Sequence, residues 1–139
     1  MKLYDLCNSL EALAPLNLQE SYDNSGLLIG NKNKTINKAL ICLDVTDDVI
    51  EEALETKSDV IIAHHPLIFK SVKKITGANM VERIIEKAIK NDIAIYAIHT
   101  NLDNIYDGVN NIFAQQLDLK NLEILQPKPN TLKKLAVYV

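Results

Sequence analysis

Long hydrophobic runs and an excess of positive charge are both missing from this sequence. No apolar run reaches the about 18 residues that a membrane-spanning helix needs, and Asp5 and Glu11 interrupt the apolar stretch that a signal peptide would require. The formal net charge of −3 excludes the global positive field of a histone-like nucleic-acid binder, although a local basic patch stays open. Four glycines and four prolines exclude collagen-like and low-complexity classes. We therefore expect a soluble, cytoplasmic protein.

Cysteine is scarce as well. The two cysteines, Cys7 and Cys42, lie in apolar-patterned segments, which disfavours a disulfide framework and predicts small core residues in a reducing compartment. What the chain does have is a large apolar share, 47% of its 139 residues. At roughly 150 residues per domain, this length predicts one compact domain with a real core.

Short apolar runs alternate with helical spacing along most of the chain. The runs at 39–43, 60–63 and 93–98 are continuous, which is typical of strands buried on both faces of a sheet. Apolar residues three or four apart predict helices at 3–13, 46–54, 79–90 and 109–117. The alternation of strands and helices indicates an α/β fold with right-handed crossovers and a mostly parallel sheet.

The C-terminal residues 121–139 indicate where a domain boundary lies. Residues 121–130 contain Pro127 and Pro129 and form the one plausible boundary, and the apolar residues 135–139 resemble the start of a further strand. An apolar end in mid-pattern predicts a fragment of a longer protein, because natural termini usually fray into polar residues. The alternative is the edge strand of a finished domain.

Polar side chains gather at the carboxyl ends of the predicted strands. Asp44 follows the first strand, His64 and His65 follow the second, and His99 follows the third, with Asp103 four residues later. The strand-to-helix loops of an open parallel sheet converge at this edge, where ligands bind. The sequence therefore predicts one polar rim that could hold a metal ion.

The doublet of His64 and His65, followed by Pro66, is the most specific element of this rim. Neighbouring side chains of an extended backbone point to opposite faces, and Pro66 favours the extended region for His65. The two imidazoles are therefore better placed for two ions, or for one ion and a substrate group, than for a single ion, unless the chain turns between them. The alternative is two hydrogen-bonded histidines at a strand end.

The later motif supplies a carboxylate. Asp103 would bring the negative charge that imidazoles lack, while His99 could ligate a metal or orient other ligands through a hydrogen bond. The alternative for His99 is a core histidine bonded to a backbone carbonyl. Asp44 is expected to cap the following helix rather than to ligate. Zinc takes about four ligands per ion, so these residues cannot fill the shells of two ions by themselves.

Other polar groups near the rim have weaker signals. Lys70, with Lys73 and Lys74, could contact an anion such as phosphate, or could be a solvated cluster. The turn at 23–26 could line the rim. The five tyrosines are scattered and predict no stacking platform, and the phosphate-binding glycine loop, the Cys-x-x-Cys pair and the Gly-x-Ser-x-Gly elbow do not occur.

Three ordered motifs resemble one known family. YDNSGL at 22–27, the segment 59–76 with AHHPLIFK at its centre, and HTNLD at 99–103 are similar to motifs of the NIF-three-like family, whose members are often named GTP cyclohydrolase I type 2 homologues. The resemblance implies a three-layer α/β fold with helices on both faces of a mostly parallel sheet. It also implies a dinuclear centre of divalent metal ions, with zinc, iron, manganese, cobalt and nickel not distinguished, and a toroidal homohexamer.

Carried over position by position, the resemblance makes His64, His65 and Asp103 metal ligands, with His99 less securely assigned. Family members continue beyond the length of this chain and supply a His-x-x-x-Glu ligand pair that has no match here, whereas residues 133–139 resemble the opening strand of the missing half. We therefore expect residues 1–126 to form the α/β metal-binding domain and residues 127–139 to begin a second half. This chain alone is expected to be inactive.

Two functions follow as hypotheses. The first is a metal-dependent hydrolase acting on a phosphorylated or nucleotide-like small molecule, with Lys70 as an anion contact. The second is a non-catalytic, metal-stabilised oligomeric scaffold or regulatory adaptor. The acidic balance disfavours nucleic acid as a partner, and family resemblance alone does not establish a reaction.

Overall fold

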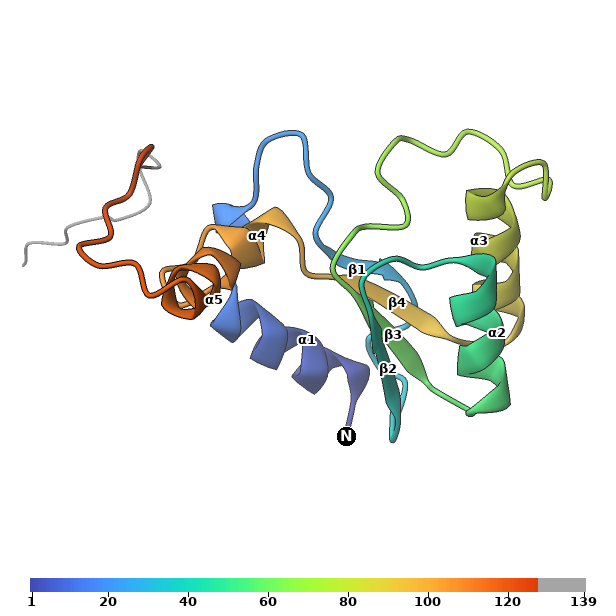
Figure 1. Ribbon diagram of the computed structural model, residues 1–139. Coiled ribbons are helices and arrows are strands. Elements are labelled where there is room, and N and C mark those ends of the chain that lie inside the picture. Colours follow the sequence, from blue (N-terminus) through green and yellow to red (C-terminus); the bar gives the residue numbers. More distant parts are fainter. Residues whose placement is uncertain (128–139) are drawn as a thin grey trace, which may run out of the picture.

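A four-stranded sheet with helices on both sides organises residues 1–127, the part of the chain that the computed structural model describes (Figure 1). The strands are β1 (Gly26–Ile29), β2 (Ala39–Cys42), β3 (Val60–Ala63) and β4 (Ala94–Ala97). The helices are α1 (Leu3–Leu13), the 3-10 turn η1 (Leu16–Leu18), α2 (Asp47–Glu55), α3 (Met80–Lys90), α4 (Thr100–Asp103) and α5 (Val109–Gln116).

The strand order is β1-β4-β3-β2. β2, β3 and β4 run parallel, with Val60 opposite both Ala39 and Ala94, and the mostly parallel sheet predicted from the sequence is confirmed. β1 joins β4 in the antiparallel direction. The apolar run at 27–29 has only three residues, which is too short to predict β1 from the sequence. The pairing of β1 with β4 comes from tertiary contacts.

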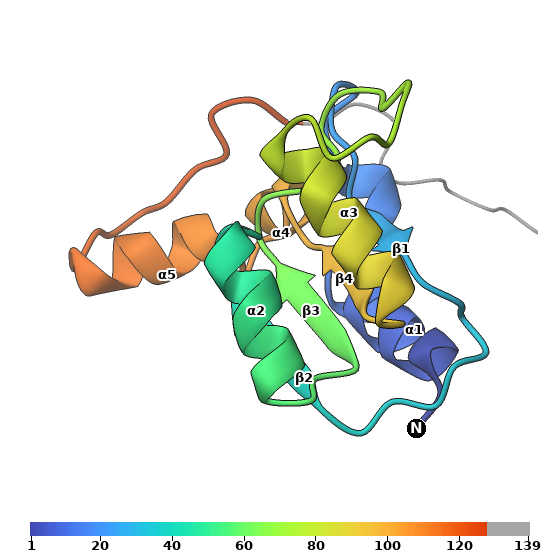
Figure 2. The same cartoon turned by 90° about the vertical axis from the view of Figure 1, so that its right-hand side faces the viewer.

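Two layers of helix cover the sheet (Figure 2). α2 and α3 cover one face and pack on Ile61 and Ile95, which are fully buried. α1 covers the other face, where Val60 and Tyr96 are buried with it. Because successive side chains of a strand point to opposite faces, β3 needs apolar residues at every position, and all four of its residues are buried.

Capping side chains fix the starts of the two helices next to the site. The Thr46 hydroxyl accepts a hydrogen bond from the Val49 N–H at the start of α2. The Asn79 side chain accepts from the Glu82 N–H at the start of α3, and the Glu82 carboxylate accepts from the N–H groups of Thr76 and Ala78. These bonds satisfy amide groups that the first helical turn leaves without partners. Both helices were predicted correctly.

The prediction that residues 39–43 are buried on both faces is wrong. Leu40 and Cys42 pack on the core beneath α2 and α3, but Ile41, on the opposite face of β2, is 77% exposed. The physical reason is position: β2 is an edge strand, and α1 covers β3 and β4 but does not reach it.

α5 forms where helical spacing predicts it, yet its apolar stripe is not covered. Ala114 is buried, whereas Phe113 is 64% exposed and Val109, Ile112 and Leu117 are exposed too. Figure 1 shows α5 beside α4, on the α1 side of the sheet and away from α2 and α3.

Three further predictions concern the cysteines, the membrane and the C-terminal strand. Cys7 is buried, Cys42 is half-buried, and both thiols are free. No helix within residues 1–127 has the length and hydrophobicity to cross a membrane. The strand predicted at 135–139 lies outside the described residues.

Candidate metal centre

Three imidazoles meet where β3 and β4 end side by side. Ala63 and Ala97 are parallel partners. His64 and His65 follow Ala63 directly, and His99 follows β4 after one residue, Ile98. Their ring centroids lie 4.9 to 5.4 Å apart. One ligand atom from each ring falls within 4.8 Å of the other two. The structure thus brings together the three histidines predicted for the rim.

The chain bends at His64 and His65, and this bend brings both rings to the same side. A strictly extended backbone would have sent them to opposite faces, so the expectation drawn from strand alternation does not hold here. Continuing backbone hydrogen bonds support the bend: His64 N–H donates to the Cys42 carbonyl and His65 N–H donates to the Leu43 carbonyl.

Each imidazole is held by a hydrogen bond at its Nδ1 atom. His64 Nδ1 donates to the Ile98 carbonyl at 2.9 Å, and His65 Nδ1 donates to Asp44 Oδ1 at 2.8 Å. His99 Nδ1 donates to Asp23 Oδ1 at 2.8 Å. Carbonyl and carboxylate oxygens only accept, so Nδ1 carries a proton in each ring, and in the neutral imidazole the Nε2 atom then has its lone pair available for a ligand. This is the arrangement that metal-binding histidines show.

Asp103 stands next to this group rather than inside it. Its Oδ1 atom lies 3.8 Å from His64 Nε2, too far for a hydrogen bond, and its side chain is 33% exposed. Two ligands of one tetrahedral zinc ion are about 3.4 Å apart, so a divalent ion between His64 and Asp103 fits this spacing with a small adjustment. The donor set of imidazole nitrogens and a carboxylate is one that divalent transition metals accept.

Asp23 holds the third imidazole from a buried position. Its side chain is fully buried and accepts from His99, the Ser25 hydroxyl, and both the hydroxyl and the N–H of Thr100. Burial alone would raise the pKa of Asp23, but hydrogen bonds from Thr100, His99 and neighbouring groups outweigh burial and lower that pKa well below its ordinary value. Asp23 is therefore a carboxylate, and it fixes the orientation of His99.

The sequence leaves open whether the turn at 23–26 lines the rim and assigns no role to Asp23. The available signal was an aspartate in the first of the three ordered motifs. Its partner His99 is 76 residues away, however, and the pairing follows from the antiparallel contact of β1 with β4.

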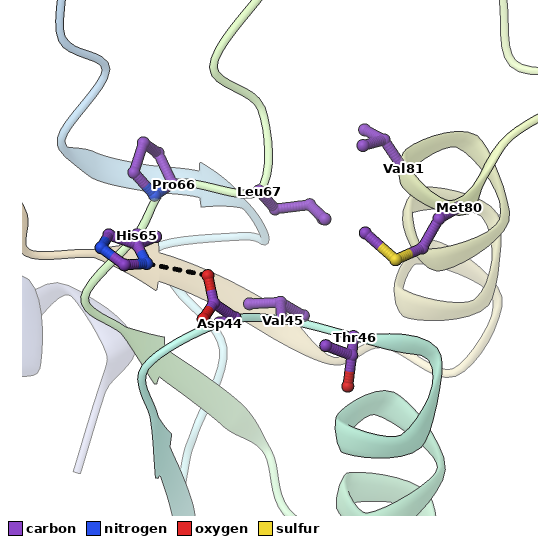
Figure 3. A pocket seen from close by; sticks show the side chains of 8 residues that line it. All are labelled: Asp44, Val45, Thr46, His65, Pro66, Leu67, Met80 and Val81. Carbon is purple, nitrogen blue, oxygen red and sulfur yellow. Dashed lines mark hydrogen bonds and ion pairs between the residues drawn. The ribbon is translucent and has the colours of Figure 1, made fainter.

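Asp44 does not cap α2, and that expectation is wrong. Thr46 is the capping residue, because it stands where its hydroxyl reaches the Val49 N–H. Asp44 lies two residues earlier and accepts from His65, as the dashed line in Figure 3 shows. A hollow of about 300 Å³ opens beside this pair, with Leu67 and the start of α3 on its far side (Figure 3).

Lys70 lies in the loop that follows the histidine doublet. With Lys73 and Lys74 it lines a hollow of about 720 Å³, whose wall also includes Phe69. Phe69 reaches toward the imidazoles, with its ring centroid 6.5 Å from that of His99. The lysine-lined hollow is therefore next to the histidine cluster.

Tyr22 has an aromatic neighbour. The centroid of its ring lies 6.3 Å from that of Phe69, with the ring planes tilted by 60°. The pairing was hidden because the two residues come from separate loops and meet only in the fold.

Fold and site together define a class: an α/β domain with a cluster of oriented imidazoles that could bind divalent metal. The chain belongs to the DUF34/NIF3 (NGG1p interacting factor 3) family, whose model matches residues 1–138.

Similar proteins agree with this membership. The chain is 51% identical over 118 residues to a GTP cyclohydrolase 1 type 2 homolog of Bacillus subtilis, a match that covers 84% of this chain and 32% of that protein. It is 47% identical over 130 residues to a protein of the same name from Halalkalibacterium halodurans, covering 93% of this chain and 35% of the relative. The chain therefore spans about a third of the length of these relatives.

A solved structure shares the fold. The crystal structure of a Bacillus cereus protein related to NIF3 superposes with a TM-score of 0.85 at 45% identity, covering 92% of this chain and 35% of that one. The α/β architecture is that of the family.

Proposed function

We propose that His64, His65 and Asp103 bind divalent metal and that the whole protein is a metal-dependent hydrolase acting on a phosphorylated or nucleotide-like small molecule. The observation that carries this proposal is the set of three imidazoles that converge at one strand edge, each with Nδ1 held and Nε2 presented. Metal-binding histidines are oriented by a hydrogen bond at the ring nitrogen that does not bind the metal, and all three imidazoles have such a bond.

The roles of the chain's own residues follow from their contacts. His64 and Asp103 would hold an ion between them, and His65 would reach the same or a neighbouring ion. His99 would either ligate or orient the other ligands, and buried Asp23 holds its ring in place. The metal, when bound, would activate water and polarise the attacked centre.

The number of ions depends on residues beyond those matched here. These candidate ligands, three imidazoles and one carboxylate, suffice for one ion but not for two, since zinc takes about four ligands. Because the chain spans about a third of its relatives, we propose that the remaining part of the protein supplies ligands for a second ion. The metal itself is one of zinc, iron, manganese, cobalt or nickel.

The substrate class rests on two supports. The curated relatives carry the name GTP cyclohydrolase 1 type 2 homolog, which refers to a hydrolytic reaction of a nucleotide. Lys70 lies in a lysine-lined hollow beside the imidazoles, where it could contact an anionic group.

Metal binding and turnover test the proposal separately. Calorimetric titration of the chain with zinc and with manganese should show binding that His65→Ala weakens at least tenfold, whereas Tyr4→Ala, a change of an exposed residue on α1, leaves it unchanged. The protein at the length of its relatives should then hydrolyse nucleotides or phosphoesters faster than its own His65→Ala variant. Equal titration curves for His65→Ala and the unchanged chain would refute the metal site.

A second candidate is favoured by the uncovered apolar surfaces of β2 and α5. Ile41, Phe113 and their exposed neighbours would be covered in an assembly, which fits a metal-stabilised homo-oligomeric scaffold or adaptor, and the family resemblance implies that this assembly is a homohexamer. Metal-dependent assembly without turnover, followed by light scattering and the same substrate panel, would favour the scaffold over the hydrolase.

A further inference from the structure

Two exposed aromatic rings lie beside the histidine cluster. Phe69 is 47% exposed and Tyr22 is 65% exposed. Their ring centroids lie 6.3 Å apart with the planes tilted by 60°, and Phe69 meets His99 edge-on at 6.5 Å. The three rings form a continuous series from solvent to the candidate metal ligands.

The backbone holds this aromatic pair in place. The Asn24 side chain donates a hydrogen bond of 2.6 Å to the Ile68 carbonyl, which joins the loop of Tyr22 to the loop of Phe69. Asp23, between Tyr22 and Asn24, is itself bound to His99. Each aromatic residue therefore stands next to a hydrogen-bonded residue, Tyr22 next to Asp23 and Phe69 next to Ile68.

An exposed aromatic residue alone needs no explanation, but the surroundings of this pair are specific. Phe69 also lines the hollow that Lys70, Lys73 and Lys74 line, where three cationic side chains face a single carboxylate, that of Glu82. Phe69 therefore lies between the lysine-lined hollow and the imidazole cluster. Aromatic side chains bind planar rings of nucleobases by stacking, whatever the base.

We propose that the Phe69 ring stacks on the planar ring of the ligand with Tyr22 against the edge of that ring, since the two side chains are tilted by 60° to each other, while the anionic group of the ligand lies in the hollow lined by the three lysines. The ligand class is then a heteroaromatic ring joined to a phosphate, as in a nucleotide, and a plain sugar phosphate is a poor ligand. This inference rests on the proposed function in one respect, since it takes the histidine cluster to be the reactive part of the site. Ring binding can nevertheless be measured without turnover.

The test compares guanosine monophosphate with ribose 5-phosphate by calorimetric titration of the full chain in the presence of zinc. The two probes share the sugar and phosphate and differ in the ring. We expect guanosine monophosphate to bind at least tenfold more tightly than ribose 5-phosphate. Phe69→Ala should weaken the binding of guanosine monophosphate about tenfold and leave the affinity for ribose 5-phosphate unchanged. Tyr22→Ala should have the same effect to a smaller degree.

Matched variants separate stacking from folding. Phe69→Tyr keeps a ring and should keep the preference, Phe69→Leu keeps apolar volume without a ring and should lose it, and Tyr4→Ala removes an equally accessible tyrosine from α1 and should change nothing. Since the sequence contains no tryptophan, Phe69→Trp gives a single reporter whose fluorescence guanosine monophosphate should quench.

The contrary results are distinct from a failure of the proposed function. Equal affinity for the two probes, no binding of guanosine monophosphate, or an unchanged preference in both Phe69→Ala and Phe69→Leu would overturn the aromatic site even if zinc binds normally. Loss of zinc binding or of hydrolysis, with the ring preference intact, would instead refute the metal-dependent hydrolase and leave the aromatic site standing.

Discussion

The strands β3 and β4 on one side, and β2 and α5 on the other, were predicted from equally strong apolar patterns, yet the burial of their side chains differs in the structure. At β3 and β4 every strand residue is buried and the polar residues that follow are hydrogen-bonded. At β2 and α5 the apolar side chains are exposed. The comparison shows that a pattern predicts an element, whereas burial depends on what packs against it.

The largest expected difference concerns two isoleucines on neighbouring strands. Ile61 on β3 is fully buried, so Ile61→Ala should lower the free energy of unfolding by about 3 kcal/mol. Ile41 on β2 is 77% exposed, so Ile41→Ala should change it by less than about 0.5 kcal/mol. Urea denaturation of both variants measures the difference, and equal losses would mean that β2 is covered in solution.

Asp23 gives the next largest effect, on the polar side of the comparison. Asp23→Ala removes the acceptor that holds His99 and should weaken zinc binding by about tenfold to a hundredfold, as losses of such outer partners do. Asp48→Ala, an exposed aspartate in α2, is the control and should leave the titration unchanged. If both variants bind zinc as the unchanged chain does, His99 needs no orientation by Asp23.

Thr46 and Asp44 test which residue caps α2. Thr46→Ala should cost about 1 kcal/mol of stability because the Val49 N–H loses its acceptor. Asp44→Ala should leave the thermal midpoint nearly unchanged and weaken metal binding through His65. The reverse pattern in thermal melts would restore Asp44 as the cap.

The smallest effect is expected on α5. Phe113 is 64% exposed, so Phe113→Ser should alter the free energy of unfolding by less than about 0.5 kcal/mol. A loss of 2 kcal/mol or more in urea denaturation would show that this ring is buried in solution, by an assembly or by another part of the chain.

The fold was predictable from sequence where local and tertiary signals agree. The continuous apolar run of β3 predicted a buried strand correctly, and the helical spacing of apolar residues at 46–54 and 79–90 predicted α2 and α3 correctly. β1 and the exposure of Ile41 were not predictable, since both depend on which strand lies at an edge.

The candidate site was predictable in part for the same reason. Strand ends indicated that His64, His65 and His99 would meet, because parallel strands bring their following residues to one edge. The bend that places the doublet on one side, and the contacts of Asp23 and Asp44 with the imidazoles, depend on tertiary hydrogen bonds that no local pattern records.

The most direct test of the central claim is a nitrogen-15 NMR spectrum of the imidazoles before and after zinc is added, since the sequence has three histidines. The structure predicts that all three carry their proton on Nδ1 and that at least the Nε2 signals of His64 and His65 shift on metal binding. Neutral imidazoles that carry their proton on Nε2 instead of Nδ1, or Nε2 signals that zinc leaves in place, would contradict the account.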